Sequence, residues 1–267
     1  MDAQLVVIVA LTFVIHLIGT LAYAFRIAGI RSGHIAIAFS LFNVLVLISR
    51  LSNSLQGPFL AKRVETAILE PGRHDLGWDF ALILAAASLA TAVGGLSIPS
   101  FQRYSTRAVQ SFHRNRSTLR ILRRSLSPRG VAEAMRAAAV PRYQNLLTLS
   151  RPLDVPVGIV AMNVAASALW TVGVLASIYA GVIEPDFRVT SSALSSVING
   201  VATILMFLLI DPYLSGLTDD AVQGRVEEAR FRRVVVWLVV GRLAGTVLAQ
   251  VLLVPAAHLI AVVARWL

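Results

Sequence analysis

The chain contains no cysteine, a single lysine (Lys62) and few charged residues of either sign. The lack of cysteine excludes disulfides, thiol nucleophiles and cysteine-ligated metals. Charged residues make up 14% of the 267 residues, against roughly 25% in a typical soluble domain. Hydrophobic residues make up 57%. This composition predicts an integral membrane protein, organised as one membrane domain over residues 1–267.

Motifs for chemistry are also missing. The apolar stretches carry no acidic cluster for a divalent metal, and the chain has no phosphate-binding glycine loop and no Ser-His-Asp arrangement. We therefore expect neither an enzyme nor a metal or other cofactor. The formal net charge is +10, nearly all of the excess being arginine. In a membrane protein the expected counter-charges are anionic lipid headgroups and a phosphorylated substrate, and nucleic acid is not an expected partner.

Hydrophobic runs predict an all-α bundle with six transmembrane helices, since each run approaches or exceeds about 20 residues. The first run follows an acidic residue and is too long for a signal peptide, so we count it as a span. The expected spans are Gln4–Phe25, Ile35–Leu55, Trp78–Ile98, Val155–Ile183, Ser192–Ile210 and Val234–Val263.

Arginine placement predicts the orientation. With six spans, 17 arginines fall on the side of the long loop at 101–153, and five basic residues fall on the other side. The positive-inside rule then places this loop in the cytoplasm and both termini outside. Leucines at 119, 122 and 126 predict one amphipathic helix in the loop, and Ser127-Pro128 predicts the start of a second helix reaching Ala139. The loop either serves as a solvated connector or recruits anionic lipid.

Three spans in each half would give an inverted repeat, with a central site near the membrane midplane. The second and fifth spans end in similar segments, Pro58-Phe59-Leu60 and Pro212-Tyr213-Leu214. Asn43 and Asn199 precede the two prolines by 15 and 13 residues. We therefore predict a possible 3+3 inverted repeat.

Two arginines lie within predicted spans, where a charge costs about 2.5–3.5 kcal/mol on insertion scales. Arg242 lies well inside the sixth span, and Arg50 lies nearer the outer end of the second. A guanidinium that lacks a carboxylate partner is free to bind a phosphate. Two structural alternatives remain: Arg50 reaching the headgroups, and the helix around Arg242 starting late.

Polar residues recur along one face of several spans, a pattern that is either packing glue or the lining of a polar cavity. His16 is open to both interpretations, as a hydrogen-bonded packing residue or a cavity residue. The clearest stripes are Ser40, Asn43, Arg50 and Ser54 in the second span, and Thr12, His16, Thr20 and Tyr23 in the first. Further stripes begin at Asn163, Ser196 and Arg242.

Three segments together resemble the Amj (alternate to MurJ) family of bacterial lipid II flippases. They are LIGTLAYAFRIAGIRSG (17–33), SLFNVLVLISRLSNSLQGPFLA (40–61) and DPYLSGLTDDAVQG (211–224). The resemblance implies a multi-pass protein of the bacterial cytoplasmic membrane. It also implies export of lipid II, the undecaprenyl-pyrophosphate-linked precursor of peptidoglycan, to the outer leaflet for cell-wall synthesis.

The residues fit that substrate, whose diphosphate, sugars and peptide cannot cross hydrocarbon unaided. We expect Arg50 and Arg242 to bind the pyrophosphate, and Asn43, Asn163, Asn199 and His16 to contact the head group. Prolines that interrupt helix hydrogen bonding make Gly57-Pro58 and Asp211-Pro212 the candidate hinges of an alternating-access cycle. Two alternatives stay open: transport of another polyprenyl-phosphate glycan or anion, and a non-transporting scaffold for wall-synthesis enzymes.

Overall fold

The computed structural model describes residues 2–117, 123, 127–136, 138 and 155–267. Six of its helical segments are long and apolar enough to cross a membrane, which confirms the predicted number of spans and the all-α fold. They are α1 (Ala3–Ser32), α2 (Ile35–Leu69), α3 (Leu76–Asn115), α7 (Val157–Ile183), a segment spanning Pro185–Val222, and α11 (Glu228–Trp266).

The fifth span is built from several pieces. A 3-10 turn, η2 (Pro185–Phe187), precedes α8 (Arg188–Ala193) and α9 (Ser195–Ile204). A π-helical segment, η3 (Leu205–Ile210), then leads into α10 (Asp211–Val222). Within it the N–H of Asp211 donates to the carbonyl of Met206, five residues back. Such π segments are rare and frequently mark functional positions in helices.

Short polar signals set the helix ends. The Asp2 carboxylate caps α1 by accepting from the N–H of Leu5 at 2.8 Å. Gly33 ends α1 in the left-handed conformation, at φ 70°, so that α2 can begin two residues later. Asp75 caps α3 by accepting from the N–H of Trp78 at 3.1 Å. Each of these positions uses a residue type preferred at helix caps.

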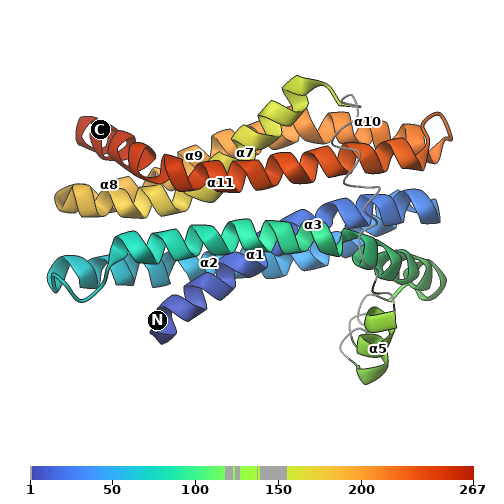
Figure 1. Cartoon of the computed structure of the whole chain (residues 1–267), viewed down its shortest axis with the longest axis horizontal. Helices are drawn as coiled ribbons and strands as arrows, with labels where there is room; N and C mark the ends of the chain where they lie inside the picture. The colour runs from blue at the N-terminus through green and yellow to red at the C-terminus, as the bar shows by residue number, and fades with distance from the viewer. Residues whose placement is uncertain (1, 118–122, 124–126, 137, 139–154) are drawn as a thin grey trace.

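The bundle divides into two halves, α1–α3 and α7–α11, which form the cool-coloured and warm-coloured groups of Figure 1. In the first half α1 packs against both α2 and α3, and in the second α7 packs against both α9 and α11. The first helix of each half thus lies between the other two. This shared pattern is what an inverted repeat would produce, and the repeat itself stays a prediction.

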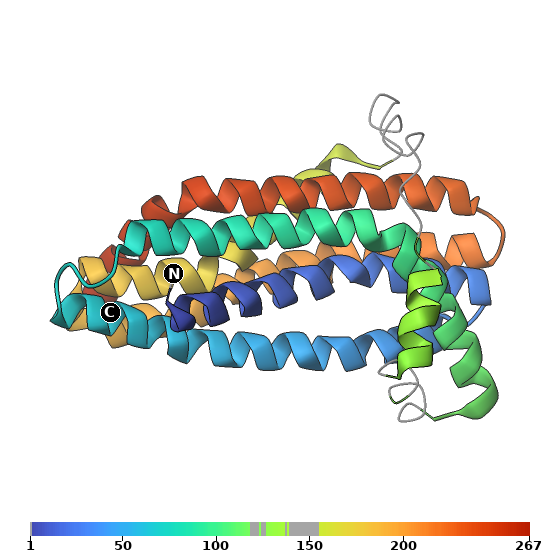
Figure 2. The ribbon, with the colours of Figure 1, turned by 60° about the horizontal axis from the view of Figure 1, so that its bottom comes forward.

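Both termini lie at one end of the bundle (Figures 1 and 2). We call it the terminal end. There Asp2 pairs with Arg63, and Arg265 pairs with Glu184 near the end of α7. We call the opposite end the basic end, where the α1–α2 turn lies beside the start of α11 through the pair of Arg31 with Glu228. The helices therefore alternate in direction as six crossings require.

Helix α3 continues well into the stretch predicted as a loop, as far as Asn115. The reason is packing, because Ser105 and Val109 are buried and the ring centroids of Phe101 and Phe25 lie 5.7 Å apart. The predicted helix start at Pro128 is confirmed by α5 (Pro128–Arg136), whose Gly130 N–H donates to the Ser127 hydroxyl. The helix predicted around Leu119, Leu122 and Leu126 lies outside the described residues, as does most of 137–153.

The apolar core forms two main clusters, one toward each end of the bundle. The cluster at the terminal end contains Leu5, Ile8, Phe80 and Ala257. The cluster at the basic end contains Tyr23, Ile27, Phe231 and Leu238, among others. Between them polar side chains are buried among the apolar ones. This polar layer, midway along α1, α7 and α11, consists of Thr12, His16, Thr20, Ser167, Thr171, Arg242 and Thr246.

Candidate functional site

Most hydroxyls of the polar layer are satisfied within their own helices. Thr12 donates to the carbonyl of Ile8 at 2.9 Å, and Thr171 donates to that of Ser167 at 2.6 Å. Thr20 and Thr246 donate to carbonyls four and three residues back. A hydroxyl that donates in this way keeps its acceptor lone pairs free. The threonines therefore fit a helical membrane core, and the unusual polar groups of the layer belong to other residues.

Arg242 is the unusual member of the layer. It is 8% exposed, its Nε has no hydrogen-bond partner, and no carboxylate in the described part of the chain lies within ion-pair distance. Its guanidinium packs on Gly19 of α1, where a Cβ atom would come within 2.4 Å of the arginine. A larger residue at position 19 would therefore displace the end of the Arg242 side chain from this position. A buried cation without a counter-ion is costly, so Arg242 is an unusual residue for the core of a membrane bundle.

His16 lies three residues before Gly19, and so shares the face of α1 on which the Arg242 guanidinium packs. It is 5% exposed, and its Nδ1 has no hydrogen-bond partner. A small hollow of about 20 Å³ opens next to it, between α1, α2 and α7, lined partly by Thr12, Gln56 and Thr171. That volume is about enough for one water molecule. The unsatisfied polar atoms of the layer therefore belong to an imidazole and a guanidinium, which are both able to donate to a phosphate.

Two predicted residues of α2 lie elsewhere. Arg50 and Asn43 are exposed on the outer side of α2, and neither Arg50 nor Arg242 has a carboxylate partner among the described residues. The structure does not bring these two arginines together, because α2 packs mainly on α1 whereas α11 packs on α7 and α3.

The expectation that polar stripes converge is therefore wrong for α2. Its predicted stripe, from Ser40 to Ser54, points away from the bundle, and the face turned toward α1 carries Ser52 and Gln56. Gln56 donates to the Thr12 hydroxyl at 2.6 Å. The stripe predicted on α1 is buried throughout, as are the stripe residues of α7.

The two other predicted asparagines lie on the second half. Asn163 donates to the carbonyl of Leu238 at 2.7 Å, tying α7 to α11. Asn199 faces Gly173 of α7, and its Oδ1 is buried without a partner. Asn163 thus acts as packing glue, and Asn199 keeps an open acceptor at the contact of α9 with α7.

The candidate hinges differ in their surroundings. Gly57 and Pro58 lie inside α2, which runs without interruption from Ile35 to Leu69. Pro212 follows the π-helical segment, in the first turn of α10. The Asp211 carboxylate accepts from Arg26 of α1 at 2.7 Å. Of the two candidate hinges, only Asp211-Pro212 therefore lies next to an irregular stretch of backbone.

Sequence reasoning missed three contributors to this region: Gly19, Gln56 and Arg26. Arg26 directly follows the predicted first span, Gln4–Phe25, and is only 8% exposed in the structure. The signal that identifies it is spacing, because Arg26 lies three residues after Tyr23, the last residue of the predicted stripe, and so shares its helical face. Gly19 and Gln56 carried no recognisable signal, since their roles depend on which helices become neighbours.

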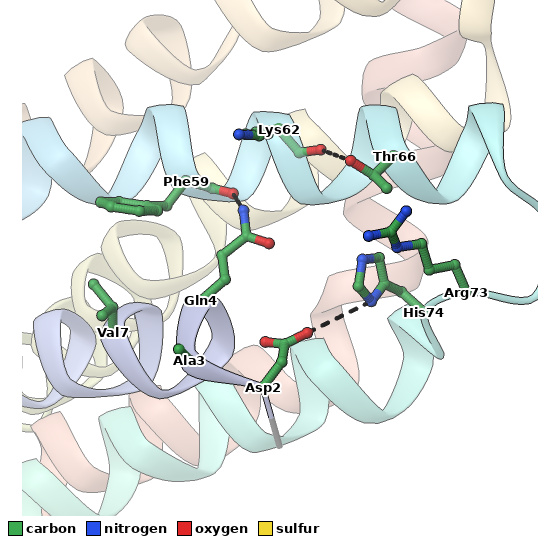
Figure 3. Close-up of a pocket in the computed structure, with 9 residues that line it drawn as sticks. All are labelled: Asp2, Ala3, Gln4, Val7, Phe59, Lys62, Thr66, Arg73 and His74. Carbon is green, nitrogen blue, oxygen red and sulfur yellow. Dashed lines mark hydrogen bonds and ion pairs between the residues drawn. The ribbon is translucent and has the colours of Figure 1, made fainter.

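A larger hollow of about 470 Å³ lies at the terminal end, where the start of α1 meets α2 and the α2–α3 turn (Figure 3). Gln4 reaches across it to the carbonyl of Phe59 at 3.0 Å, and Asp2 points toward His74. Arg63 stands beside this hollow and pairs with both Asp2 and Asp79. This end of the first half is therefore tied together by charge, in contrast to the unpaired Arg242.

Comparison with known proteins gives a family. A relative from Bacillus subtilis (strain 168), named lipid II flippase Amj, is 33% identical over 267 aligned positions, which cover 98% of this chain and 97% of the relative. No solved structure matches the chain. The family model described as Alternate to MurJ matches residues 11–264. The buried polar layer is thus a feature of a chain that belongs to the Amj family.

Proposed function

We propose that this protein moves lipid II from the inner to the outer leaflet of the bacterial cytoplasmic membrane. The substrate assignment follows the name of the Bacillus subtilis relative and the family description. A flippase of this kind is a transporter and needs no catalytic residue. Its task is to give the diphosphate and the sugar-peptide head a polar surface while the prenyl tail stays in lipid.

The observation that carries the mechanism is the buried, carboxylate-free guanidinium of Arg242 in the polar layer. A guanidinium can hold two oxygens of a diphosphate in a bidentate contact. In this proposal Arg242 binds the diphosphate at the middle of its path, and His16 donates a further hydrogen bond. Asn199 offers its free acceptor to the head group.

Arg50 takes a different place in the same proposal. Its side chain is exposed on α2, among leucines that are also exposed, so it faces the lipid. There it can meet the diphosphate of a lipid-linked substrate from outside the bundle, with Asn43 nearby on the same face. Arg50 and Arg242 then act at different stages, and the loss of Arg50 should affect capture of the substrate more than its passage.

The orientation completes the proposal. The basic end faces the cytoplasm, as the arginine excess there predicts, and both termini lie outside. Anionic lipids of the inner leaflet are attracted to the arginines of this end and of the 101–153 segment. The terminal hollow beside Asp2 then lies on the exit side.

The decisive experiment asks whether the protein sustains growth as the only lipid II flippase of a cell. In that strain, exposure of lipid II at the outer leaflet should depend on Arg242, and Arg242→Gln should abolish both exposure and growth. Deleting residues 103–142 distinguishes the scaffold alternative from the proposed flippase. The scaffold alternative predicts that growth is lost on this deletion and that Arg242→Gln is fully active. Normal lipid II exposure with Arg242→Gln would rule out the site we propose.

A further inference from the structure

Arg26 is another buried arginine, located nearer the basic end on the face of α1 that carries Gly19. Its guanidinium donates to the Asp211 carboxylate at 2.7 Å and to the Ser215 hydroxyl at 3.4 Å, both on α10. Its Cζ lies 4.9 Å from the centroid of the Phe39 ring on α2. The two hydrogen bonds to α10 join the first half of the bundle to the second. The pair with Asp211 uses one carboxylate oxygen, so it is not bidentate.

Arg26 and Arg242 lie along one line. Arg242 packs on Gly19, which precedes Arg26 by seven residues, or about 10 Å along the axis of α1. Between them lies Tyr23, which is buried on the same face of α1, four residues after Gly19 and three before Arg26. Asp211 is 34% exposed, so this line begins near the surface of the basic end and ends in the polar layer.

Ion pairs that join the two halves occur at the basic end among the residues that the structure describes. Arg26–Asp211 and Arg31–Glu228 both cross from α1 to the second half. At the terminal end the described pairs stay within one half, as in Arg63 with Asp2 and Asp79, and Arg265 with Glu184. The basic end is therefore the end at which charge holds the halves together.

We propose that Arg26 is the entry residue for a lipid-linked diphosphate, and that Asp211 occupies it until the substrate arrives. This inference rests on the proposed function. The diphosphate takes Arg26 away from Asp211, which loosens α1 from α10 at the basic end. It then passes Tyr23 and reaches Arg242 two helical turns further in.

Charge and geometry favour this exchange. A diphosphate offers more negative charge and more acceptor oxygens than one carboxylate, and guanidinium binds such groups in a bidentate manner. Asp211 directly follows the π-helical segment, where the helix hydrogen bonding is already irregular. Release of Asp211 would therefore occur next to an irregular stretch of the fifth span.

The test measures binding of undecaprenyl diphosphate to the purified full chain in nanodiscs, with undecaprenol as the neutral lipid control. Arg26→Gln should weaken diphosphate binding at least tenfold and leave undecaprenol binding unchanged. Asp211→Asn should bind the diphosphate as tightly as the wild type or more tightly. Arg265→Gln, which breaks the pair with Glu184 at the terminal end, is the matched control and should bind as the wild type does.

A charge swap distinguishes this role from a merely structural one. Arg26→Asp combined with Asp211→Arg should recover thermal stability but not diphosphate binding. The inference is overturned if the swap restores both, if Arg26→Gln binds normally, or if Asp211→Asn weakens binding as much as Arg26→Gln. In any of these cases Arg242→Gln tests the proposed function separately. Weakened diphosphate binding by Arg242→Gln would support the proposed function, and unchanged binding would contradict it.

Discussion

At the scale of single residues, two buried arginines of this bundle differ in what surrounds them. Arg63 is held by Asp2 and Asp79, whereas Arg242 has no carboxylate partner within the described ranges. Removing one partner of a buried ion pair strands the other charge, at a cost of about 3–5 kcal/mol. Removing an unpaired buried charge instead removes the free-energy cost of burying that charge. The same substitution should therefore have opposite effects at the two positions.

We expect Arg242→Met to unfold at a higher temperature than the wild type, because a flexible apolar chain of similar length replaces an unpaired cation. Flipping should be lost, since the contact to the diphosphate is worth about 2 kcal/mol, or roughly thirtyfold in affinity. Arg63→Met, the matched control, should lower the unfolding temperature. Thermal unfolding in nanodiscs measures both, and a destabilised Arg242→Met would mean that Arg242 has a structural partner after all.

Acid should release the N-terminus from the first half. The N–H of Leu5 and the guanidinium of Arg63 lower the pKa of Asp2 below its usual value of 3.8. A lowered folded-state pKa contributes stability that is fully present above the ordinary pKa and is lost as the pH falls through the folded value. The stability difference between wild type and Asp2→Asn should thus be constant from pH 7 to about 5 and shrink below about 4. Unfolding temperatures at each pH check this, and a difference that grows in acid would contradict it.

At the scale of helices, hydropathy predicted which segments span the membrane and underestimated where most of them end. Helix α2 was expected to stop at Leu55 and runs to Leu69, because its polar end is held by the pairing of Arg63. The buried stripe of α1 was predictable from spacing. The buried face of α2 was not predictable. One face carries Ser40, Asn43, Arg50 and Ser54, and another carries Ser52 and Gln56, so both are polar. Only packing against α1 determines which of the two faces is buried.

The fifth span shows the same limit and leads to a prediction about its hinge. Its hydrophobic run could not reveal a π-helical segment, which depends on a shifted hydrogen-bond ladder ending at Asp211. Pro212 has no N–H, so it leaves a carbonyl of that ladder without a donor. Pro212→Ala supplies the donor and should slow flipping several-fold while keeping or raising the unfolding temperature.

The control for this hinge variant is Pro255→Ala, which alters a proline inside α11 that we assign to no hinge. It should leave the flipping rate near the wild-type value. Pro58→Ala tests the other candidate hinge in α2, where the helix is continuous. Lipid II exposure over time measures all three rates. Equal rates for Pro212→Ala and Pro255→Ala would remove the hinge from the fifth span.

At the scale of the whole molecule, the two ends of the bundle differ in charge, and this difference predicts the orientation of the protein in the membrane. The structure confirms that both termini share one end, with six crossings between the ends. The basic end carries Arg26, Arg31 and the arginines that begin α11, and α3 adds Arg103 and Arg107. Arginine is retained on the cytoplasmic side because basic loops are translocated poorly. The basic end should therefore face the cytoplasm.

A chain without cysteine makes this orientation directly measurable. Asp186→Cys places a thiol in the exposed turn after α7 at the terminal end, and Gln223→Cys places one in the exposed turn between α10 and α11. In intact cells a membrane-impermeant maleimide should label the first variant and not the second, and both should react once the membrane is permeabilised. The unaltered chain is the blank. The reverse labelling would show that the bundle has the opposite orientation. Arg26 would then be an exit residue, and the hollow beside Asp2 would lie on the side where substrate enters.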